Sequence, residues 1–441
     1  MYKTVKFGGS SLANGNQFIK VKNIVKSDPD RKYVVVSAPG KFNGEPNKIT
    51  DLLYLTHAHL KYGISHEEIM NKVKDRFYAI QAACSIDFDL DREFAEIDSR
   101  FVKNVSQDYV VSRGEYLTAK LLAAYLGYTF FDPIDCMHLD YSGKVLLERS
   151  LESFRNSLKP EERYVIPGFY GSTSPGRIKL LSRGGSDITG AVVACASNSV
   201  IYENWTDVSG ILMADPRIVD NPEKIGHITY DELKEMSYMG AEVLHEDSIF
   251  PVREMKIPIN IRNTNEPEDP GTYIMENIPE GYTKADKFIT GITGKKNYTV
   301  LTVYNRLLSS DVASLKDILD VYDKYGIKFE HMQIGINNIS VLINDPDVLS
   351  RIHEVRDELY KTNEPDSISI TENISLISVV GRNMVMKPGI SGKIFAALGK
   401  EKINIRMITQ SPSEINIIVG VEDASFEDAI RTLYSSFTSS K

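Results

Sequence analysis

The stretch Leu181-Ser182-Arg183-Gly184-Gly185-Ser186-Asp187-Ile188 joins two segments of different periodicity. An apolar extended run leads into it, and the run after it has apolar residues on one helical face: Ile188, Val192 and Cys195. This order predicts a strand, a Gly-Gly turn and a helix. Glycines at a helix start can direct backbone N–H groups toward an anion, and Arg183 stands at the mouth of this turn. An ordinary turn capped by Asp187 is the alternative, and the segment alone does not separate the two.

Composition places the chain among ordinary globular proteins. Its 441 residues correspond to about three domains of average size. The net charge of −9 argues against a protein that binds nucleic acid by neutralising phosphates. Three scattered cysteines without a CxxC spacing predict free thiols in a reducing compartment. Because we find no apolar signal region and no long apolar span, we expect a cytoplasmic protein without a membrane partner.

Two strands near the N-terminus end in small, turn-forming residues. Thr4–Phe7 leads into Gly8-Gly9-Ser10-Ser11, and Tyr33–Ser37 leads into Ala38-Pro39-Gly40-Lys41. Continuous β-branched runs are typical of parallel strands covered on both faces, whose carboxyl ends form the ligand-binding edge of a sheet. Lys6 lies inside the first strand. It either points into a polar site or stands on an edge strand in water.

Glu115 belongs to the stretch Ser112-Arg113-Gly114-Glu115-Tyr116-Leu117-Thr118, which we expect to open a helix that ends at Gly127. A carboxylate in the first turn suits the helix dipole. Glu115 is therefore either a plain cap or a ligand for a substrate ammonium group.

Two further strands are predicted at Tyr164–Gly171 and Val200–Asn204. Thr206 and Asp207 follow the second of these strands at its carboxyl end. That position fits contact with a nucleotide or the positioning of a catalytic lysine, and a simple Asp turn before Gly210 is the alternative.

Neither a Walker A sequence nor a dinucleotide-binding fingerprint occurs in the chain. Five spaced blocks occur instead: Lys6–Ser11, Ser37–Gly40, Ser112–Glu115, Arg183–Asp187 and Trp205–Val208. Together and in this order they resemble the aspartate kinases of the amino-acid kinase family. The resemblance implies an α/β fold with a three-layer α/β/α catalytic domain and a mostly parallel sheet over residues 1–285. It also implies phosphorylation of the β-carboxylate of L-aspartate by MgATP, the first step toward lysine, threonine and methionine.

The same resemblance assigns roles on the nucleotide side of the site. Lys6 would lie between the transferring phosphoryl group and the aspartate carboxylate, and Asp207 is the second residue assigned to catalysis. Backbone N–H groups of three residues would cradle the ATP phosphates: Gly8, Gly9 and Ser10. Further contacts with ATP would come from Thr206, Asp207, Leu212 and Arg217. The Mg²⁺ ions would sit mainly on phosphate oxygens and water, so we expect no cluster of metal-binding side chains.

On the aspartate side, the resemblance implies that Glu115 takes the ammonium group and Arg183 a carboxylate. Phe169 would wall the pocket. The remaining contacts with the amino acid would come from Ser37, Ser186 and Asp187. These residue types suit the reaction, because phosphoryl transfer depends on positioning and on neutralising spread negative charge. The β-carboxylate is itself the nucleophile, so no general base is needed.

Two positions depart from the family pattern. Glu242 stands where many relatives carry a lysine that is drawn near the ATP phosphates, so we expect Arg217 or a nearby lysine to take its place. Leu212 stands where some relatives place a tyrosine that stacks on the nucleotide. Neither change touches the predicted aspartate pocket.

From about Ile289 the chain contains an internal duplication. Leu301–Ile343 and Ile377–Val419 each read as a strand, a loop, an amphipathic helix and two strands. The pair resembles the tandem α+β (βαββαβ) ACT domains of aspartate kinases, and we place them at 286–370 and 371–441. The resemblance implies an amino-acid effector and a homodimer, or a dimer of dimers, through these domains.

The expected effector is lysine, with threonine as the alternative. If the first copy holds the site, the positions to suspect are Asp311, Val312, Ala313, Glu330 and His331. Sheet packing without any ligand is the other interpretation of these residues.

Three other functions fit the sequence less well. Another carboxylate kinase of the same fold is less consistent with the Arg183–Asp187 block and Glu115, which suit a free amino acid. A catalytically inactive amino-acid sensor does not require Lys6, Arg183 and Asp207 together. An added homoserine dehydrogenase would need a further domain, for which we expect no room before Lys441.

Overall fold

The computed structural model describes the chain except for residues 43, 174–175, 183, 242–243, 245, 280, 283–287, 307–311, 386 and 439–441. By their internal contacts the residues form two compact units. The first comprises 1–211, 224–234 and 242–284, and the second comprises 212–223, 235–241 and 285–441. No helix in the described part of the chain is long and apolar enough to cross a membrane.

The first unit is built on a sheet with the strand order β10-β12-β11-β7-β1-β2-β4-β3. Neighbouring strands pair in parallel, except that β11 and β12 are antiparallel. The predicted mostly parallel sheet is therefore confirmed. The strands span Lys3–Phe7 (β1), Arg31–Val36 (β2), Thr129–Phe130 (β3), Tyr164–Pro167 (β4), Ile201–Thr206 (β7), His227–Thr229 (β10), Ile259–Asn263 (β11) and Thr272–Met275 (β12).

Strand β1 shows how the sheet is covered on both faces. Successive side chains of a strand point to opposite faces. Val5 and Phe7 join the apolar core formed with α1 and α5, whereas Lys6 reaches Asp187 of α7. Because β1 lies between β2 and β7, the interpretation of Lys6 as an edge-strand residue in water is wrong. The α/β/α layering is confirmed.

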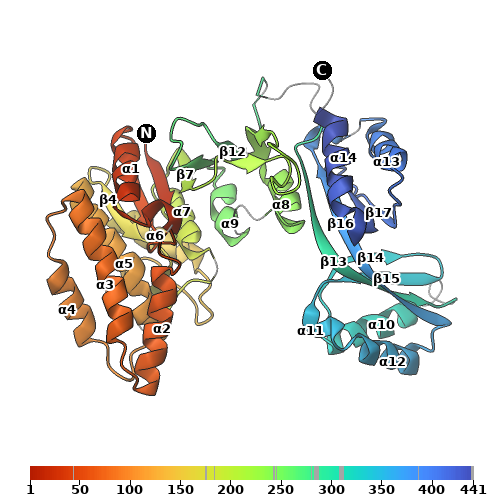
Figure 1. Cartoon of the computed structure of the whole chain (residues 1–441), viewed down its shortest axis with the longest axis horizontal. Helices are drawn as coiled ribbons and strands as arrows, with labels where there is room; N and C mark the ends of the chain where they lie inside the picture. The colour runs from red at the N-terminus through yellow and green to blue at the C-terminus, as the bar shows by residue number, and fades with distance from the viewer. Residues whose placement is uncertain are drawn as a thin grey trace. The chain divides into compact units, whose positions relative to one another are not determined.

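Figure 1 shows the helices around this sheet, with α2, α3, α4 and α5 grouped together. The helices of this unit and the short 3₁₀ turns are α1 (Gly15–Lys26), α2 (Ile49–Tyr62), α3 (Glu67–Cys84), α4 (Leu90–Ser99), α5 (Gln107–Leu126), α6 (Leu147–Ser157), α7 (Gly185–Ala196), α9 (Glu246–Glu254), η1 (Gly9–Leu12) and η2 (Pro133–Asp135). Helix α8 (Tyr230–Tyr238) begins in the first unit and ends in the second. Strands β8 (Ile211–Leu212) and β9 (Lys224–Ile225) form a separate two-stranded pair.

The expected single strand Tyr164–Gly171 is in fact two. Strand β4 ends at Pro167, and β5 (Tyr170–Ser172) pairs with β6 (Ile178–Leu180) outside the main sheet. The chain turns at Phe169, whose φ of +73° is a left-handed conformation that non-glycine residues seldom adopt. The turn places the Phe169 side chain beside the start of α7.

The second unit carries an antiparallel sheet with the order β14-β15-β13-β16-β18-β17. Its strands are β13 (Gly291–Tyr304), β14 (Phe329–Ile334), β15 (Asn338–Ile343), β16 (Ser367–Val380), β17 (Met407–Thr409) and β18 (Asn416–Glu422). The helices and 3₁₀ turns are α10 (Val312–Lys324), α11 (Pro346–Leu349), α12 (Ile352–Asn363), α13 (Ile390–Lys400), α14 (Phe426–Thr438), η3 (Arg382–Met384) and η4 (Asp423–Ser425). The predicted order of strand, helix and two strands occurs twice, as β13-α10-β14-β15 and β16-α13-β17-β18, and the ACT-like architecture is confirmed.

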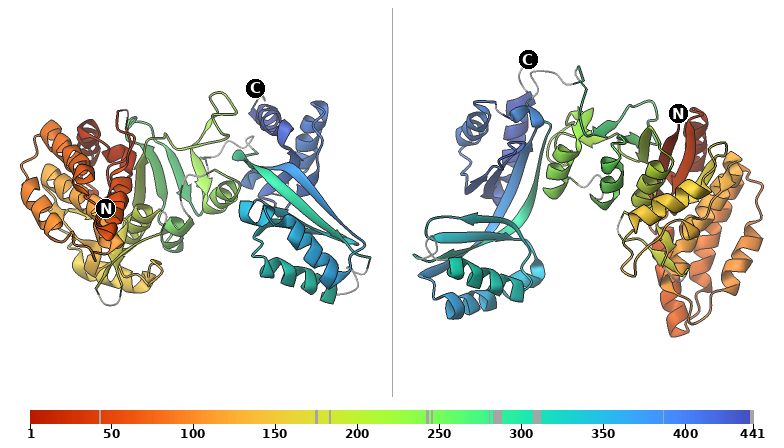
Figure 2. Two further views of the ribbon diagram at one scale, coloured as in Figure 1. Left: turned by 60° about the horizontal axis from the view of Figure 1, so that its bottom comes forward. Right: turned by 180° about the vertical axis from the view of Figure 1, so that it is seen from behind.

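Strands β13 and β16 are long and run side by side along both halves of this sheet (Figure 2). Their pairing is interrupted near Lys295 to Tyr298, where the register shifts. Asn297 and Asn373, which lie at this interruption, both have positive φ. Such a bulge bends a strand, and asparagine tolerates the left-handed conformation that it requires.

Candidate active site

Lys6 lies at the centre of a buried polar cluster in the first unit. Its Nζ is 2.7 Å from Asp187 Oδ1 and 3.4 Å from Asn204 Oδ1, and Asn204 Nδ2 donates to the same Asp187 oxygen at 2.8 Å. The parallel register sets Lys6 opposite Asn204 on β7, and Lys6 is only 7% exposed. Removing a charged amine from water is costly unless it is paired, so this strand position depends on the two partners.

Asp187 does not cap α7 as the sequence alternative proposed. The N-cap is Gly184, in the left-handed conformation with φ of +72°, and it makes no side-chain capping bond. Asp187 therefore lies within the first turn, where its carboxylate is directed to Lys6. The carboxylate in contact with Lys6 is that of Asp187 rather than that of Asp207, which is exposed and accepts a bond from the Thr206 hydroxyl at 3.1 Å.

The loops that follow β1 and β2 interlock through two glycines. Gly40 N donates to Gly9 O at 2.8 Å. A Cβ on Gly9 would lie 2.9 Å from Ala38 O, and one on Gly40 would lie 2.7 Å from Gly9 C. Only glycine permits so close an approach of two backbones. Gly8 N already donates to Trp205 O at 3.0 Å, which leaves Gly9 and Ser10 as the candidates for the predicted phosphate cradle.

Glu115 is a buried carboxyl group with one oxygen in use. Its Oε1 accepts the Ala38 N–H at 3.0 Å, while Oε2 is buried without a hydrogen-bond partner among the described residues. Burial raises the pKa of Glu115 to about 8, against the opposing effects of the Ala38 N–H and the Arg113 charge. An orphaned acceptor of this kind is rare in folded proteins and suits a ligand that donates hydrogen bonds.

The predicted place of Glu115 in a first helical turn is wrong. Helix α5 begins at Gln107, where Ser106 caps it by accepting the Tyr109 N–H at 3.2 Å, so Glu115 lies in the middle of the helix. The apolar pattern alone placed the start of this helix near Ser112, whereas the capping residue Ser106 lies further toward the N-terminus. The predicted end at Gly127 is confirmed by its left-handed φ of +67°.

Phe169 and Ser186 are held together at the start of α7. A Cβ on Gly185 would lie 2.6 Å from the Phe169 ring, and one on Gly168 would lie 2.7 Å from the Ser186 hydroxyl. Phe169 N donates to Thr189 Oγ1 at 3.3 Å. Ser37 follows β2 and donates its N–H to Phe7 O at 3.2 Å, which ties it to the end of β1. Arg183 lies outside the described residues, as does Glu242.

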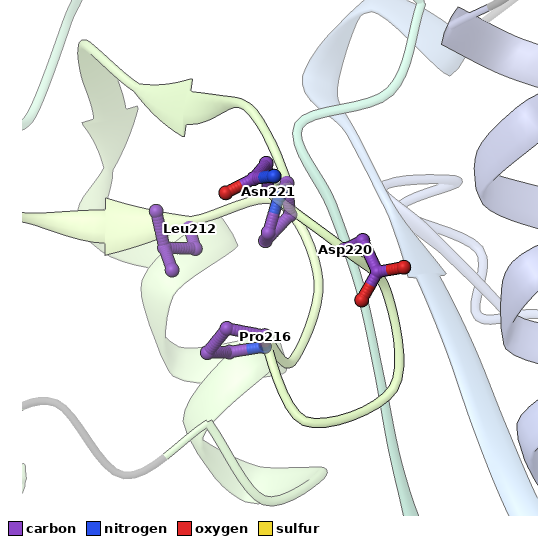
Figure 3. Close-up of a pocket in the computed structure, with 5 residues that line it drawn as sticks. Leu212, Pro216, Asp220 and Asn221 are labelled. Atoms are coloured by element: carbon purple, nitrogen blue, oxygen red, sulfur yellow. The ribbon is translucent and has the colours of Figure 1, made fainter.

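Leu212 and Arg217, which the sequence assigned to the nucleotide, belong to the second unit. Leu212 lines a cavity of about 550 Å³ together with Pro216, Asp220, Asn221 and Pro222 (Figure 3). This volume is in the range of small-molecule sites. Arg217 is bound to Asp215 at 2.6 Å with its side chain 88% exposed. The nucleotide contacts of both residues stay predictions.

The suspected effector residues differ in their surroundings. Glu330 on β14 accepts a hydrogen bond from Tyr298 and lies 3.5 Å from Lys295 Nζ. His331 Nε2 is buried without a partner in the described part of the chain, and burial lowers the pKa of His331. Val312 and Ala313 begin α10, and Asp311 falls outside the described residues.

Asn204 and the Ala38 N–H are the parts of the site that sequence analysis missed. Asn204 is a polar residue at a buried position of β7, where a polar side chain needs a partner, and that is the signal that could have singled it out. Among the described residues, no group of three or more His, Cys, Asp or Glu side chains is placed to hold a metal ion.

The chain is similar to two family models, to curated proteins and to solved structures. Residues 1–263 match the model of the amino acid kinase family, and residues 377–437 match an ACT domain model. Aspartokinase 3 of Bacillus subtilis is 32% identical over 457 residues, which cover 99% of this chain and 98% of that protein. The crystal structure of Clostridium acetobutylicum aspartate kinase is 45% identical, covers 99% of both chains and superposes with a TM-score of 0.90.

A more distant structure shares the fold. E. coli aspartokinase III is 24% identical over 99% of both chains, and it has been solved with aspartate and ADP (TM-score 0.76) and with lysine and aspartate (TM-score 0.75). The family match spans more than half of the chain, and the Bacillus relative is similar from end to end. This chain therefore belongs to the amino acid kinase family, as one of its aspartokinases.

Proposed function

We propose that this protein transfers the γ-phosphoryl group of ATP to the β-carboxylate of L-aspartate and so forms 4-phospho-L-aspartate. The observation that carries the proposal is the buried Lys6 cluster beside an interlocked pair of glycine loops. Glu115 lies behind the second loop, with an oxygen that has no partner in the described part of the chain. These groups supply the cation, the backbone donors and the acceptor that a phosphate and an amino acid require.

Lys6 acts on the transferring phosphoryl group. An ammonium on a central strand neutralises charge that spreads over the phosphoryl oxygens in the transition state, and Asp187 and Asn204 hold it in place beforehand. The aspartate β-carboxylate attacks the γ-phosphorus, and the bond to the bridging oxygen breaks to release ADP. Gly9 and Ser10 would direct N–H groups to the phosphates. Thr206 and Asp207 would contact the rest of the nucleotide.

Glu115 binds the aspartate ammonium through its free oxygen. A carboxyl group with a pKa of about 8 is mostly protonated at neutral pH, and an incoming ammonium favours its ionised form. Arg183 would take the α-carboxylate, while Ser37, Ser186 and Phe169 would complete the pocket. Mg²⁺ carried on the phosphate oxygens would lower their charge, and we assign it no protein ligands.

We also propose that the C-terminal part of the chain regulates the activity. We assign residues 1–285 to catalysis, and 286–370 and 371–441 to two ACT domains that respond to lysine and join chains in a homodimer or a dimer of dimers. The lysine complex of E. coli aspartokinase III suggests this effector. The cytoplasmic location that we expect from the sequence stays a prediction.

One assay tests the catalytic proposal. The purified full chain is mixed with MgATP, L-aspartate and hydroxylamine, which traps the acyl phosphate as the aspartyl hydroxamate. Lys6→Ala should reduce the rate on the order of 10²- to 10³-fold, because one preorganised charge contact is lost. Glutamate in place of aspartate should give little product. A wild-type rate no higher than that of Lys6→Ala would refute the kinase assignment.

Regulation is tested by titrating lysine and threonine separately and together in the same assay. Inhibition by lysine alone supports the proposed effector. Full activity in millimolar concentrations of both amino acids would refute feedback through the ACT domains.

A further inference from the structure

Arg76 is a charged residue in the buried stripe of α3. The apolar members of that stripe recur every three or four positions: Ile69, Val73, Phe77 and Ile80. Arg76 falls on the same face and is 7% exposed. Burial of a guanidinium is unfavourable unless its N–H groups find acceptors, so Arg76 depends on hydrogen-bond partners around it.

The guanidinium of Arg76 donates to the backbone of two separate loops. Its Nη1 donates to Gly40 O at 3.0 Å and to Ala13 O at 3.4 Å, and its Nη2 donates to Asn47 O at 3.4 Å. Nη2 also lies 3.5 Å from Glu45 Oε2, and the group stacks over the Phe42 ring at 4.7 Å. A planar fork with several fixed donors can serve all these acceptors at once, which a single ammonium cannot do.

These two loops carry the candidate active site. The loop before Ala13 contains Gly9, and the loop from Ser37 to Lys48 contains Ala38 and Gly40. Gly40 N is bonded to Gly9 O, and Ala38 N holds the carboxyl group of Glu115. Arg76 contacts the first loop at Ala13 and the second loop at Gly40. Gly40 is two residues from Ala38, whose N–H orients Glu115.

Both loops have attachments besides Arg76, but those of the second loop lie at Ser37 to Gly40, so the rest of that loop depends more on Arg76. Gly8 N donates to Trp205 O, and the Ser11 hydroxyl lies 2.7 Å from that of Thr264. In the second loop, the Arg76 contacts reach Gly40, Glu45 and Asn47 over most of its length. Loss of Arg76 should therefore displace the aspartate side of the site more than the phosphate side.

We propose that Arg76 is a positioning residue for phosphoryl transfer, which holds loop 37–48 so that Ala38 and Gly40 stay in place against Glu115 and Gly9. It touches neither substrate. The inference rests on the proposed function for its kinetic consequence, but the loop geometry that it predicts can be measured without any activity.

The kinetic test compares Arg76→Ala and Arg76→Lys with Lys72→Ala, a control on the exposed face of the same helix. Arg76→Ala should raise KM for aspartate by about tenfold or more and change KM for ATP by much less, because small displacements of positioning groups are costly. Methylguanidinium in solution should restore part of the activity of Arg76→Ala. Arg76→Lys should keep an intermediate activity, and Lys72→Ala should behave as wild type.

Hydrogen exchange tests the geometry directly. In Arg76→Ala, amides of the segment 37–48 should exchange faster, while those of β1 and β7 should keep the wild-type rate. Lys72→Ala, on the exposed face of α3, should change neither exchange nor kinetics. If Arg76→Ala does not fold, Arg76→Lys serves in its place, with smaller effects in the same direction.

The outcomes separate the two proposals. An inactive wild type would refute the kinase assignment, and the exchange data would still decide the role of Arg76. Folded Arg76 variants with wild-type kinetics and exchange would overturn the positioning role alone. Lower stability with unchanged KM for aspartate and no rescue by methylguanidinium would show a merely structural residue and also overturn it.

Discussion

Glu115 in the first unit and Glu330 in the second are both carboxyl groups that the sequence singles out as ligands for an amino acid, yet their environments differ. Glu115 is 4% exposed and its Oε2 has no hydrogen-bond partner among the residues that the structure describes, so one bond remains to be made there. Glu330 is less buried and already engages Tyr298 and Lys295. A ligand at Glu115 would add a missing bond, whereas a ligand that uses Glu330 would have to replace existing ones.

The largest expected effect comes from removing the charge at the unsatisfied carboxyl. Glu115→Gln should lower kcat/KM for aspartate on the order of 10²- to 10³-fold and leave KM for ATP nearly unchanged, because only the ammonium loses its partner. Steady-state hydroxamate assays with each substrate varied would measure this. A comparable loss in KM for ATP would mean that Glu115 faces the nucleotide.

Aspartate binding should also release a proton from the wild-type site. At pH 7 a group with a pKa of about 8 is mostly protonated, and pairing with an ammonium ionises it. Calorimetric titrations in buffers of different ionisation enthalpy should detect about one proton released per aspartate, and none for Glu115→Gln. Equal proton counts for both proteins would indicate that Glu115 is ionised before aspartate binds.

The same carboxyl should reduce stability as the pH rises. Its folded pKa of about 8 lies above the ordinary 4.5, so the native state binds the proton more tightly. Any stability that the wild type gains over Glu115→Gln from this proton is fully present below pH 4.5 and is lost as the pH approaches 8. Between pH 5 and 7 the wild type should lose on the order of 2 kcal/mol relative to the variant. Thermal unfolding of the two proteins side by side would test it, and parallel pH profiles would contradict it.

In the second unit, Glu330→Gln should mainly affect regulation. We expect the lysine concentration for half inhibition to rise by about fivefold, because a partly exposed charge contributes on the order of 1 kcal/mol. Activity without lysine should stay at the wild-type level. An unchanged lysine response would place the effector elsewhere, and Lys324→Gln, at an exposed lysine of α10 paired with Glu358, is a matched control.

The smallest effect is expected from Tyr298→Phe. Tyr298 is buried, and its hydroxyl donates to Glu330, so the variant loses one hydrogen bond and keeps the ring packing. We expect a loss of about 1 kcal/mol in the unfolding of the second unit. Chemical denaturation of the two proteins would measure this loss, and an unchanged free energy of unfolding would show that the Tyr298–Glu330 hydrogen bond does not stabilise the second unit.

Much of the fold was accessible from local patterns. Continuous β-branched runs predicted buried parallel strands, and they form a mostly parallel sheet with β1 at its interior. The duplication after Ile289 predicted two similar α+β halves. The errors arose where a boundary depended on single residues: Ser106 extends α5 backward, and Phe169 divides one expected strand into two.

The sequence by itself determined which residue types gather at the carboxyl edge of the sheet, since strands that end in Gly, Ser and charged residues bring them there whatever the helices do. It also determined the family, through five blocks in order. Only the tertiary structure decided which groups are partners. Lys6 pairs with Asp187, 181 positions away, because β1 and α7 pack face to face, and Arg76 reaches two loops because α3 lies beneath both.

The state of the Glu115 carboxyl group was likewise decided only by the tertiary structure. A sequence shows that a carboxyl group exists, but burial and the count of donors around it depend on every element that packs against it. Those surroundings make Glu115, which the sequence left open as a helix cap or an ammonium ligand, a buried acid with a pKa of about 8.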